Sequence, residues 1–127
     1  MEKPFILNLT QHNATPDQVA AGVMEPQKKA EIQALLTFGE LPDYGEITER
    51  ARKLARIAKG AGATHALIGG APYLMGALEN ALLAEGVAPM YAFSQRCCVE
   101  TAHPDGTVTK SLVFKHQGFV TPHAETK

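Results

Sequence analysis

The sequence predicts one α/β domain with a three-layer, Rossmann-like and mostly parallel sheet, to which a C-terminal antiparallel hairpin is added. Three observations lead to this fold class. Short apolar segments alternate with helical patterns, a strand–glycine–helix–strand unit spans residues 63–93, and an Asp-Gly pair separates two strand-like segments near the C-terminus. We expect a single domain over residues 1–120 and a flexible polar tail over residues 121–127.

The N-terminal segment predicts a buried strand that leads into a helix. Residues 5–9, Phe-Ile-Leu-Asn-Leu, are almost continuously apolar, which is typical of a strand covered on both faces. The next helix is predicted to begin at Thr15, because Pro16 suits a first helical turn and Gln18 completes a capping box with Thr15. Gly22 follows closely, so we expect this helix to be short.

Helical spacing recurs in the middle of the chain. Residues 26–38 predict a second short helix, with an extended segment over residues 34–38 as the alternative. The clearest pattern covers residues 46–61, where an apolar stripe lies opposite charged side chains and Lys59 comes late, as the helix dipole favours. The stripe consists of Ile47, Ala51, Leu54, Ala55 and Ala58.

The strand–glycine–helix–strand unit predicts a right-handed parallel crossover. Residues 63–68 form its first strand, a helix opens at Ala71, and a third strand over residues 88–93 leads into Ser94-Gln95-Arg96. We expect these three residues to form a polar loop at the end of the strand.

The predicted hairpin carries the only two cysteines, Cys97 and Cys98. Its strands, residues 97–101 and 107–116, flank a turn that contains Asp105-Gly106. Adjacent residues of a strand point to opposite faces, so we expect reduced thiols and no disulfide. This expectation, together with the lack of a signal-peptide pattern, favours a cytoplasmic protein.

Composition excludes several functional classes. The formal net charge is -1, so we expect no extended nucleic-acid surface. No apolar segment approaches membrane-spanning length. The five histidines show no paired metal-ligand spacing, and no dinucleotide or P-loop motif is present, so we expect no metal and no cofactor.

Polar or glycine-bearing loops follow all three strands of the predicted parallel sheet. In open parallel sheets, ligands bind beyond the carboxyl ends of the strands, so we expect these loops to line one pocket. The candidate catalytic residues are His12, as an acid or base, with Thr10 and Arg96. The candidate ligand-binding residues are Asn8, Gln11, Gly69, Gly70, Ala71, Tyr73, Ser94 and Gln95. For each loop the alternative is a structural one: a tight glycine turn, a helix entry, or an ordinary surface arginine.

The order of these motifs resembles that of small CRISPR-associated proteins with the CARF-type Rossmann fold. The resemblance rests on Ile6-Leu7-Asn8-Leu9-Thr10-Gln11-His12, on residues 68–71 and 92–96, and on the glycine-centred hairpin. It implies a homodimer that binds cyclic oligoadenylates, as that family does, and its ring-nuclease members cleave them without a metal. In this chain Ala71-Pro72-Tyr73 stands where the family has a basic residue. The sequence also resembles uncharacterised prophage proteins.

Two functions follow from these patterns. The first is a protein of a CRISPR or phage-defence context that binds a nucleotide-type anionic ligand. If it is also an enzyme, it is a metal-independent phosphodiesterase of the ring-nuclease kind. The second is a non-enzymatic phage or prophage protein that acts through contacts with copies of itself or with a partner. Missing catalytic signatures and a net charge close to zero favour the second, and the converging loops favour the first.

Overall fold

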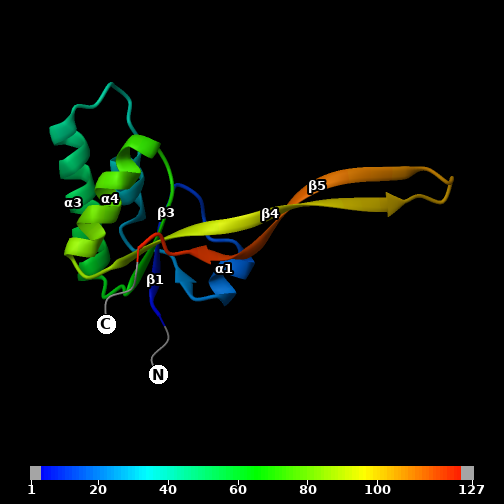
Figure 1. Ribbon diagram of the computed structural model, residues 1–127, viewed down its shortest axis with the longest axis horizontal. Coiled ribbons are helices and arrows are strands. Elements are labelled where there is room, and N and C mark those ends of the chain that lie inside the picture. Colours follow the sequence, from blue (N-terminus) through cyan, green and yellow to red (C-terminus); the bar gives the residue numbers. More distant parts are fainter. Residues whose placement is uncertain (1–3, 124–127) are drawn as a thin grey trace.

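The computed structural model describes residues 4–123 and contains one five-stranded sheet with four helices in those residues (Figure 1). In chain order the strands are β1 (Ile6–Leu9), β2 (Val23–Met24), β3 (His65–Ile68), β4 (Ala88–Ala102) and β5 (Val108–Val120). The helices are α1 (Pro16–Ala20), α2 (Lys29–Leu36), α3 (Tyr44–Gly60) and α4 (Pro72–Ala84). The strand order is β2-β1-β3-β4-β5; all neighbours are parallel except β4 and β5. The predicted fold class is therefore confirmed.

The chain leaves the two central strands in opposite directions. From β1 it passes through α1 to β2 on one side of the sheet order, whereas from β3 it passes through α4 to β4 on the other. Figure 1 shows α1 on the opposite side of the sheet from α3 and α4. Such a reversal leaves a crevice beyond the carboxyl ends of the central strands, where doubly wound proteins bind their ligands.

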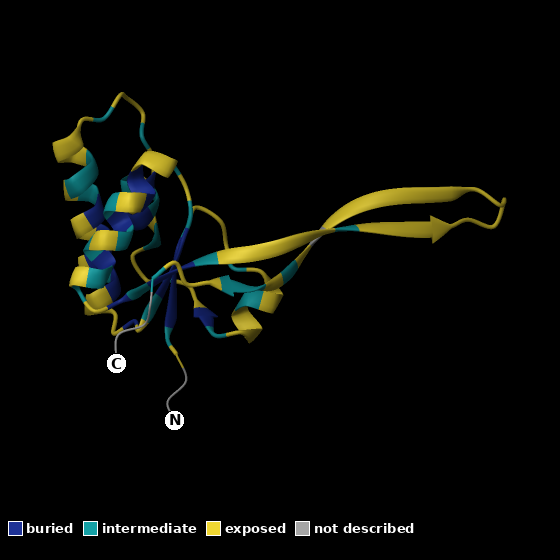
Figure 2. Ribbon diagram, viewed as in Figure 1, coloured by how far each residue is buried: buried dark blue, intermediate teal, exposed yellow. Residues whose placement is uncertain are grey.

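One face of the sheet holds the main hydrophobic core. Helices α2, α3 and α4 cover this face, and their buried residues pack against Leu7 and its neighbours (Figure 2). The predicted stripe of α3 is confirmed, because Leu54, Ala55 and Ala58 are fully buried. Leu78 of α4 is equally buried. Full burial of one such leucine stabilises the fold by about 1.5–3 kcal/mol, so this layer supplies most of the stability.

The opposite face of the sheet has a much thinner covering. Ile6, Val23, Leu67 and Met90 form a small second cluster there. Helix α1 has no buried residue, and its Val19 stays 55% exposed. The third layer of the fold is therefore one short helix and the loops beside it.

The local signals for helix ends agree with the structure. The predicted capping box of α1 is present: the Thr15 hydroxyl accepts a hydrogen bond from the Gln18 N–H (3.2 Å), and the Gln18 side chain accepts one from the Thr15 N–H (3.0 Å). Helix α3 begins earlier than predicted, because the Asp43 carboxylate accepts a hydrogen bond from the Glu46 N–H at 2.8 Å. Helix α2 continues to Leu36, so the alternative of an extended segment from residue 34 is wrong.

The prediction that a strand ends at residue 93 and leads into a Ser94-Gln95-Arg96 loop is wrong. Strand β4 continues to Ala102, and these three residues pair with His116, Lys115 and Phe114 of β5. The ladder is irregular only between Phe93 and Ser94. Consecutive polar residues are typical of a loop, but an antiparallel ribbon that faces solvent tolerates them on both faces. Strand β2 was also missed, because a two-residue strand has no recognisable pattern.

Beyond residue 93 the hairpin separates from the rest of the molecule. The β3–β4 pairing ends at Met90, and from there β4 pairs with β5 (Figure 1). We call residues 94–116 the arm and the remaining described residues the body. Figure 2 shows the arm exposed along almost its whole length. The predicted flexible tail stays a prediction, and residues 124–127 lie outside the described residues.

Candidate functional site

A pocket of about 370 Å³ lies at the carboxyl ends of β1, β3 and β4, where the chain reverses. Two of the three predicted loops meet in it: residues 10–13 after β1, and Gly69-Gly70 after β3. Tyr91 and Ala92 of β4 complete the wall. The position agrees with the expected place of a ligand in a parallel sheet.

Asn8 organises the first loop from inside the fold. Its side chain is only 2% exposed, and its amide donates to the His12 carbonyl (2.8 Å) and to the Glu25 carboxylate (3.0 Å). Its side-chain oxygen accepts from the Thr10 N–H (3.0 Å) and the Thr10 hydroxyl (2.7 Å). Asn8 was predicted to bind ligand, but these bonds occupy both ends of its amide. It therefore acts as a positioning residue.

Helix α2 holds the other side of the same loop. The Gln33 side chain donates to the Thr10 carbonyl (3.0 Å), and the Gln11 side chain donates to the Thr37 hydroxyl (2.9 Å). The hydroxyl of Thr37 in turn donates to the Gln33 carbonyl (2.7 Å). These contacts fix the backbone of the loop, whereas the His12 side chain remains exposed on the pocket wall.

Two charged residues that the sequence patterns did not indicate lie beside the pocket. Glu25 accepts hydrogen bonds from the Ala14 N–H (2.7 Å) and from Asn8. Burial raises the pKa of the Glu25 carboxyl, but the hydrogen bonds from Ala14 and Asn8 and the charge of Lys29 outweigh it, so the pKa is lowered overall. Lys29 hydrogen-bonds Asn13 of the pocket wall and lies 3.8 Å from Glu25. No local spacing marks this cluster, because β2 and the start of α2 bring it to the loop.

The glycine turn lies close to the first loop. A Cβ at Gly69 would be 3.8 Å from the Thr10 side chain, in ordinary van der Waals contact. Gly70 has a φ of 146°, a conformation that residues with a side chain rarely adopt. No side chain caps α4, whose first turn follows directly. The backbone N–H groups of Gly69 and Gly70 suit an anionic group in the pocket.

Tyr91 forms the wall on the β4 side. Its hydroxyl donates to the Glu79 carboxylate at 2.5 Å, and the other Glu79 oxygen lies 2.6 Å from the His123 ring. Burial, and then the hydrogen bond and charge of Glu79, raise the pKa of Tyr91 well above its usual value, so the phenol is a neutral donor. The wall is therefore held by α4 and by the residues that follow β5.

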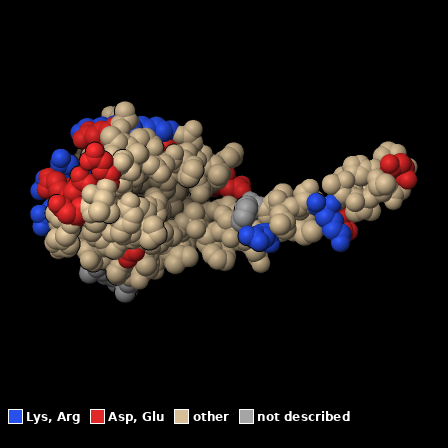
Figure 3. All heavy atoms as spheres, turned by 90° about the horizontal axis from the view of Figure 1, so that it is seen from above, with Lys and Arg blue, Asp and Glu red and all other residues tan. Residues whose placement is uncertain are grey.

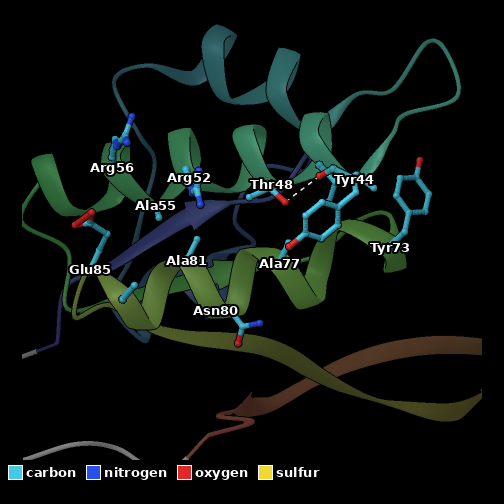
Figure 4. Close-up of a pocket in the computed structure, with 12 residues that line it drawn as sticks. Tyr44, Thr48, Arg52, Ala55, Arg56, Tyr73, Ala77, Asn80, Ala81 and Glu85 are labelled. Atoms are coloured by element: carbon cyan, nitrogen blue, oxygen red, sulfur yellow. Dashed lines mark hydrogen bonds between the residues drawn. The ribbon is translucent and has the colours of Figure 1, made fainter.

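The remaining predicted site residues lie elsewhere. Ser94, Gln95 and Arg96 belong to the arm, and Ala71 does not line the pocket. Tyr73 lies in a separate groove of about 610 Å³ between the outer faces of α3 and α4 (Figure 4). The structure thus brings together Thr10, Gln11, His12, Gly69 and Gly70, and it places the only arginine among the candidates outside the pocket.

The Tyr73 groove has the features of a helix surface rather than of a closed site. Tyr73 packs edge-to-face on Phe38, with ring centroids 5.2 Å apart, and Figure 4 shows Tyr44 and Tyr73 at one end of the groove. Its floor consists largely of alanines, while Arg52 lies on its wall. No deep polar group is directed into it among the residues that line it.

Three other features of residues 4–123 bear on function. None of the helices has the length and apolar character that a bilayer span requires. Within the same residues no three His, Cys, Asp or Glu side chains lie where they could hold a metal ion. Cys97 and Cys98 are both free thiols, as predicted.

Comparison with known proteins places this geometry in a family. Residues 4–120 match the uncharacterized protein MJ1673 family. The chain belongs to the MJ1673 family. No curated protein and no solved structure matches the chain. The residues that match the MJ1673 family include the whole pocket wall and the whole arm.

Proposed function

We propose that the pocket between β1 and β3 binds a nucleotide-type anionic ligand. The observation that carries this proposal is the meeting of two polar loops, residues 10–13 and 69–70, at the point where the strand order reverses. A cytoplasmic protein of a CRISPR or phage-defence system is the context that the CARF-type resemblance suggests, and cyclic oligoadenylates are its first candidate ligands.

The wall of the pocket offers such a ligand neutral hydrogen-bond donors. The N–H groups of Gly69 and Gly70 would bind a phosphate, whereas the Gln11 side chain and the Thr10 hydroxyl suit ribose or base. The pocket is at the lower end of the roughly 300–1,000 Å³ range of ligand sites. It therefore has room for about one nucleotide unit. A cyclic oligonucleotide would have to be shared with a second copy of the chain.

If the ligand is cleaved, His12 would act as the general base. In a metal-independent reaction the 2′-hydroxyl of the ligand attacks the adjacent phosphorus, and the bond from phosphorus to the 5′-oxygen breaks. The products are a 2′,3′-cyclic phosphate and a 5′-hydroxyl: His12 accepts the 2′-hydroxyl proton, and the leaving 5′-oxygen takes a proton from solvent water. Because Arg96 does not line the pocket, charge on the phosphate would be stabilised by the glycine turn and not by that guanidinium.

Thermal unfolding with a ligand panel tests the proposal. The panel contains adenosine monophosphate, linear diadenylate, cyclic tri-, tetra- and hexa-adenylate, and a sugar phosphate. A ligand at one hundred times its Kd adds about 2.7 kcal/mol to the unfolding free energy, which raises Tm by several degrees. We expect this shift in the wild type and in His103→Ala, whose substitution lies at the tip of the arm, and a much smaller shift in His12→Ala. A panel without any shift would refute the proposal.

A second function, a non-enzymatic interaction protein, is favoured by a different observation. The arm exposes apolar side chains that the body does not cover, including Leu112 at 64% and Val108 at 56%. If this is the main function, His12→Ala retains activity and substitutions on the arm abolish it. A bacterial growth or phage-plaque assay with both variants decides between the two functions.

A further inference from the structure

The arm is the part of the molecule with the fewest contacts to the rest of the chain. Residues 94–102 and 108–116 form a ribbon of two strands, about 30 Å long from the rise per residue of a strand. Every described side chain from residue 92 to residue 113 is exposed except that of Cys97, which is half-buried. A two-stranded ribbon without a third strand or a packed helix is marginally stable in water. We therefore expect contacts with a partner to stabilise the arm.

The two faces of the arm differ in composition. Residues directly opposite each other in the ladder lie on the same face. One face carries the pairs Cys98–Leu112 and Ala102–Val108, and the other carries Cys97–Val113 and Val99–Ser111. The first face has the more exposed apolar side chains, because Leu112 and Val108 exceed the 44% of Val99. We call it the Leu112 face.

The charge of the arm favours a protein partner over a nucleic acid. The arm contains three basic residues, Arg96, Lys110 and Lys115, and two acidic residues, Glu100 and Asp105. Proteins that grip a nucleic-acid backbone concentrate positive charge instead. Figure 3 shows that neutral atoms make up most of the visible surface of the arm.

The Leu112 face is complementary to itself. Arg96 and Glu100 lie on this face, each two residues from Cys98 and on opposite sides of it. Two copies of the face, related by a two-fold axis through Cys98 with their strands antiparallel, would bring Arg96 of each copy over Glu100 of the other. Leu112 would meet Leu112 at the centre. Glu100 already lies 3.7 Å from Lys110 of its own chain and would gain a second cation.

We infer that the arm is a dimerisation element, and that its occupant is the Leu112 face of a second copy of this chain. The arrangement places Leu112 and Cys98 at the centre, with the charged pairs on either side of them. Val108 and Ala102 lie beyond these pairs, opposite His116 and Ser94 of the other copy. One face of such a ribbon is smaller than the roughly 800 Å² per partner of a standard interface, so we expect a weak and reversible dimer. The inference does not depend on the ligand of the pocket.

Charge reversal tests the inference through pairs of variants. In Arg96→Glu both charged positions of the two-fold interface are acidic, and in Glu100→Arg both are basic. Each variant alone is therefore expected to lose self-association by at least about tenfold. Mixed in equal amounts, the two variants restore both opposite-charge pairs and form heterodimers. Sedimentation velocity over a wide range of protein concentration measures the self-association of each sample.

Cross-linking of the cysteines tests the inference in chains that keep all the charges. Two Cys98 thiols would face each other across the two-fold axis, so mild oxidation with copper phenanthroline is expected to join two copies of Cys97→Ser as a disulfide. The matched control, Cys98→Ser, keeps only the thiol of the opposite face and should remain uncross-linked. A wild type that stays monomeric over the whole range, a mixture of the charge variants that does not associate, or equal cross-linking through the two thiols would each overturn the inference.

Discussion

Leu78 in the body and Leu112 in the arm show how differently one sequence signal is used in the two regions. Both are leucines placed by regular apolar spacing, yet Leu78 is 0% exposed and Leu112 is 64% exposed. In the body, the apolar stripes of α3 and α4 pack against other elements of the same chain. In the arm, the apolar side chains of the Leu112 face are exposed to solvent in the structure of residues 4–123. The comparison suggests that the body is stabilised by its own core, whereas the arm depends on association.

The same substitution in both regions tests this difference most directly. Leu78→Ala removes a fully buried side chain and leaves a cavity, so we expect a loss of about 3 kcal/mol in unfolding free energy. Leu112→Ala should change the unfolding free energy by less than about 0.5 kcal/mol when the chain is monomeric. Urea denaturation at low protein concentration measures both. Equal losses in unfolding free energy would mean that the Leu112 side chain packs against its own chain, and would contradict the difference between the body and the arm.

The polar core of the pocket region should respond nearly as strongly as the apolar core. Asn8→Ala deletes five hydrogen bonds from a buried side chain, two of them to the Glu25 carboxylate, and leaves the Thr10 N–H and the His12 carbonyl without that partner. We expect a loss of about 2 kcal/mol. Asn80→Ala, on the exposed side of α4, is the matched control and should cost less than about 0.5 kcal/mol. A loss of the same size in both variants would show that the Asn8 bonds do not stabilise the loop.

Low pH should act on both regions, because one carboxyl in each has a lowered pKa: Glu25 in the body and, through hydrogen bonds from Thr107, Asp105 in the arm. The pKa of Glu25 is lower in the folded state than its ordinary value of 4.5, so the unfolded chain binds this proton first as the pH falls. The stabilisation from Glu25 is complete above about pH 4.5 and is lost as the pH falls through the folded-state pKa. Melting from pH 6 to pH 3 should therefore show a shallower loss of stability in Glu25→Gln than in the wild type. Parallel slopes would contradict this assignment.

The smallest effect is expected for the charged pair of the arm. Lys110 and Glu100 lie 3.7 Å apart, with side chains 70% and 62% exposed. An exposed ion pair contributes little, so Glu100→Gln should change the monomer's unfolding free energy by less than about 0.5 kcal/mol. Thermal melts at low concentration check this value. A larger loss would indicate that the pair holds the ribbon together within one chain.

The sequence alone determined those elements whose signals lie within a few residues. The capping box of Thr15 and Gln18, the stripe of α3 and the turn at Asp105-Gly106 were all predictable, because caps, helical faces and tight turns depend on near neighbours. The same reasoning located two of the three loops of the candidate site. It also gave the fold class, since the alternation of strands and helices limits the possible topologies.

Only the tertiary structure decided which residues share a site. Ser94, Gln95 and Arg96 looked like a loop, but pairing with residues 114–116 extends β4 and carries Arg96 out along the arm. Glu25 hydrogen-bonds Asn8 because β2 pairs with β1. No pattern within either segment predicts this pairing. The physical reason is the same in both cases: strand pairing and buried hydrogen bonds join residues far apart in the chain, and their energies are set by the partner rather than by local sequence.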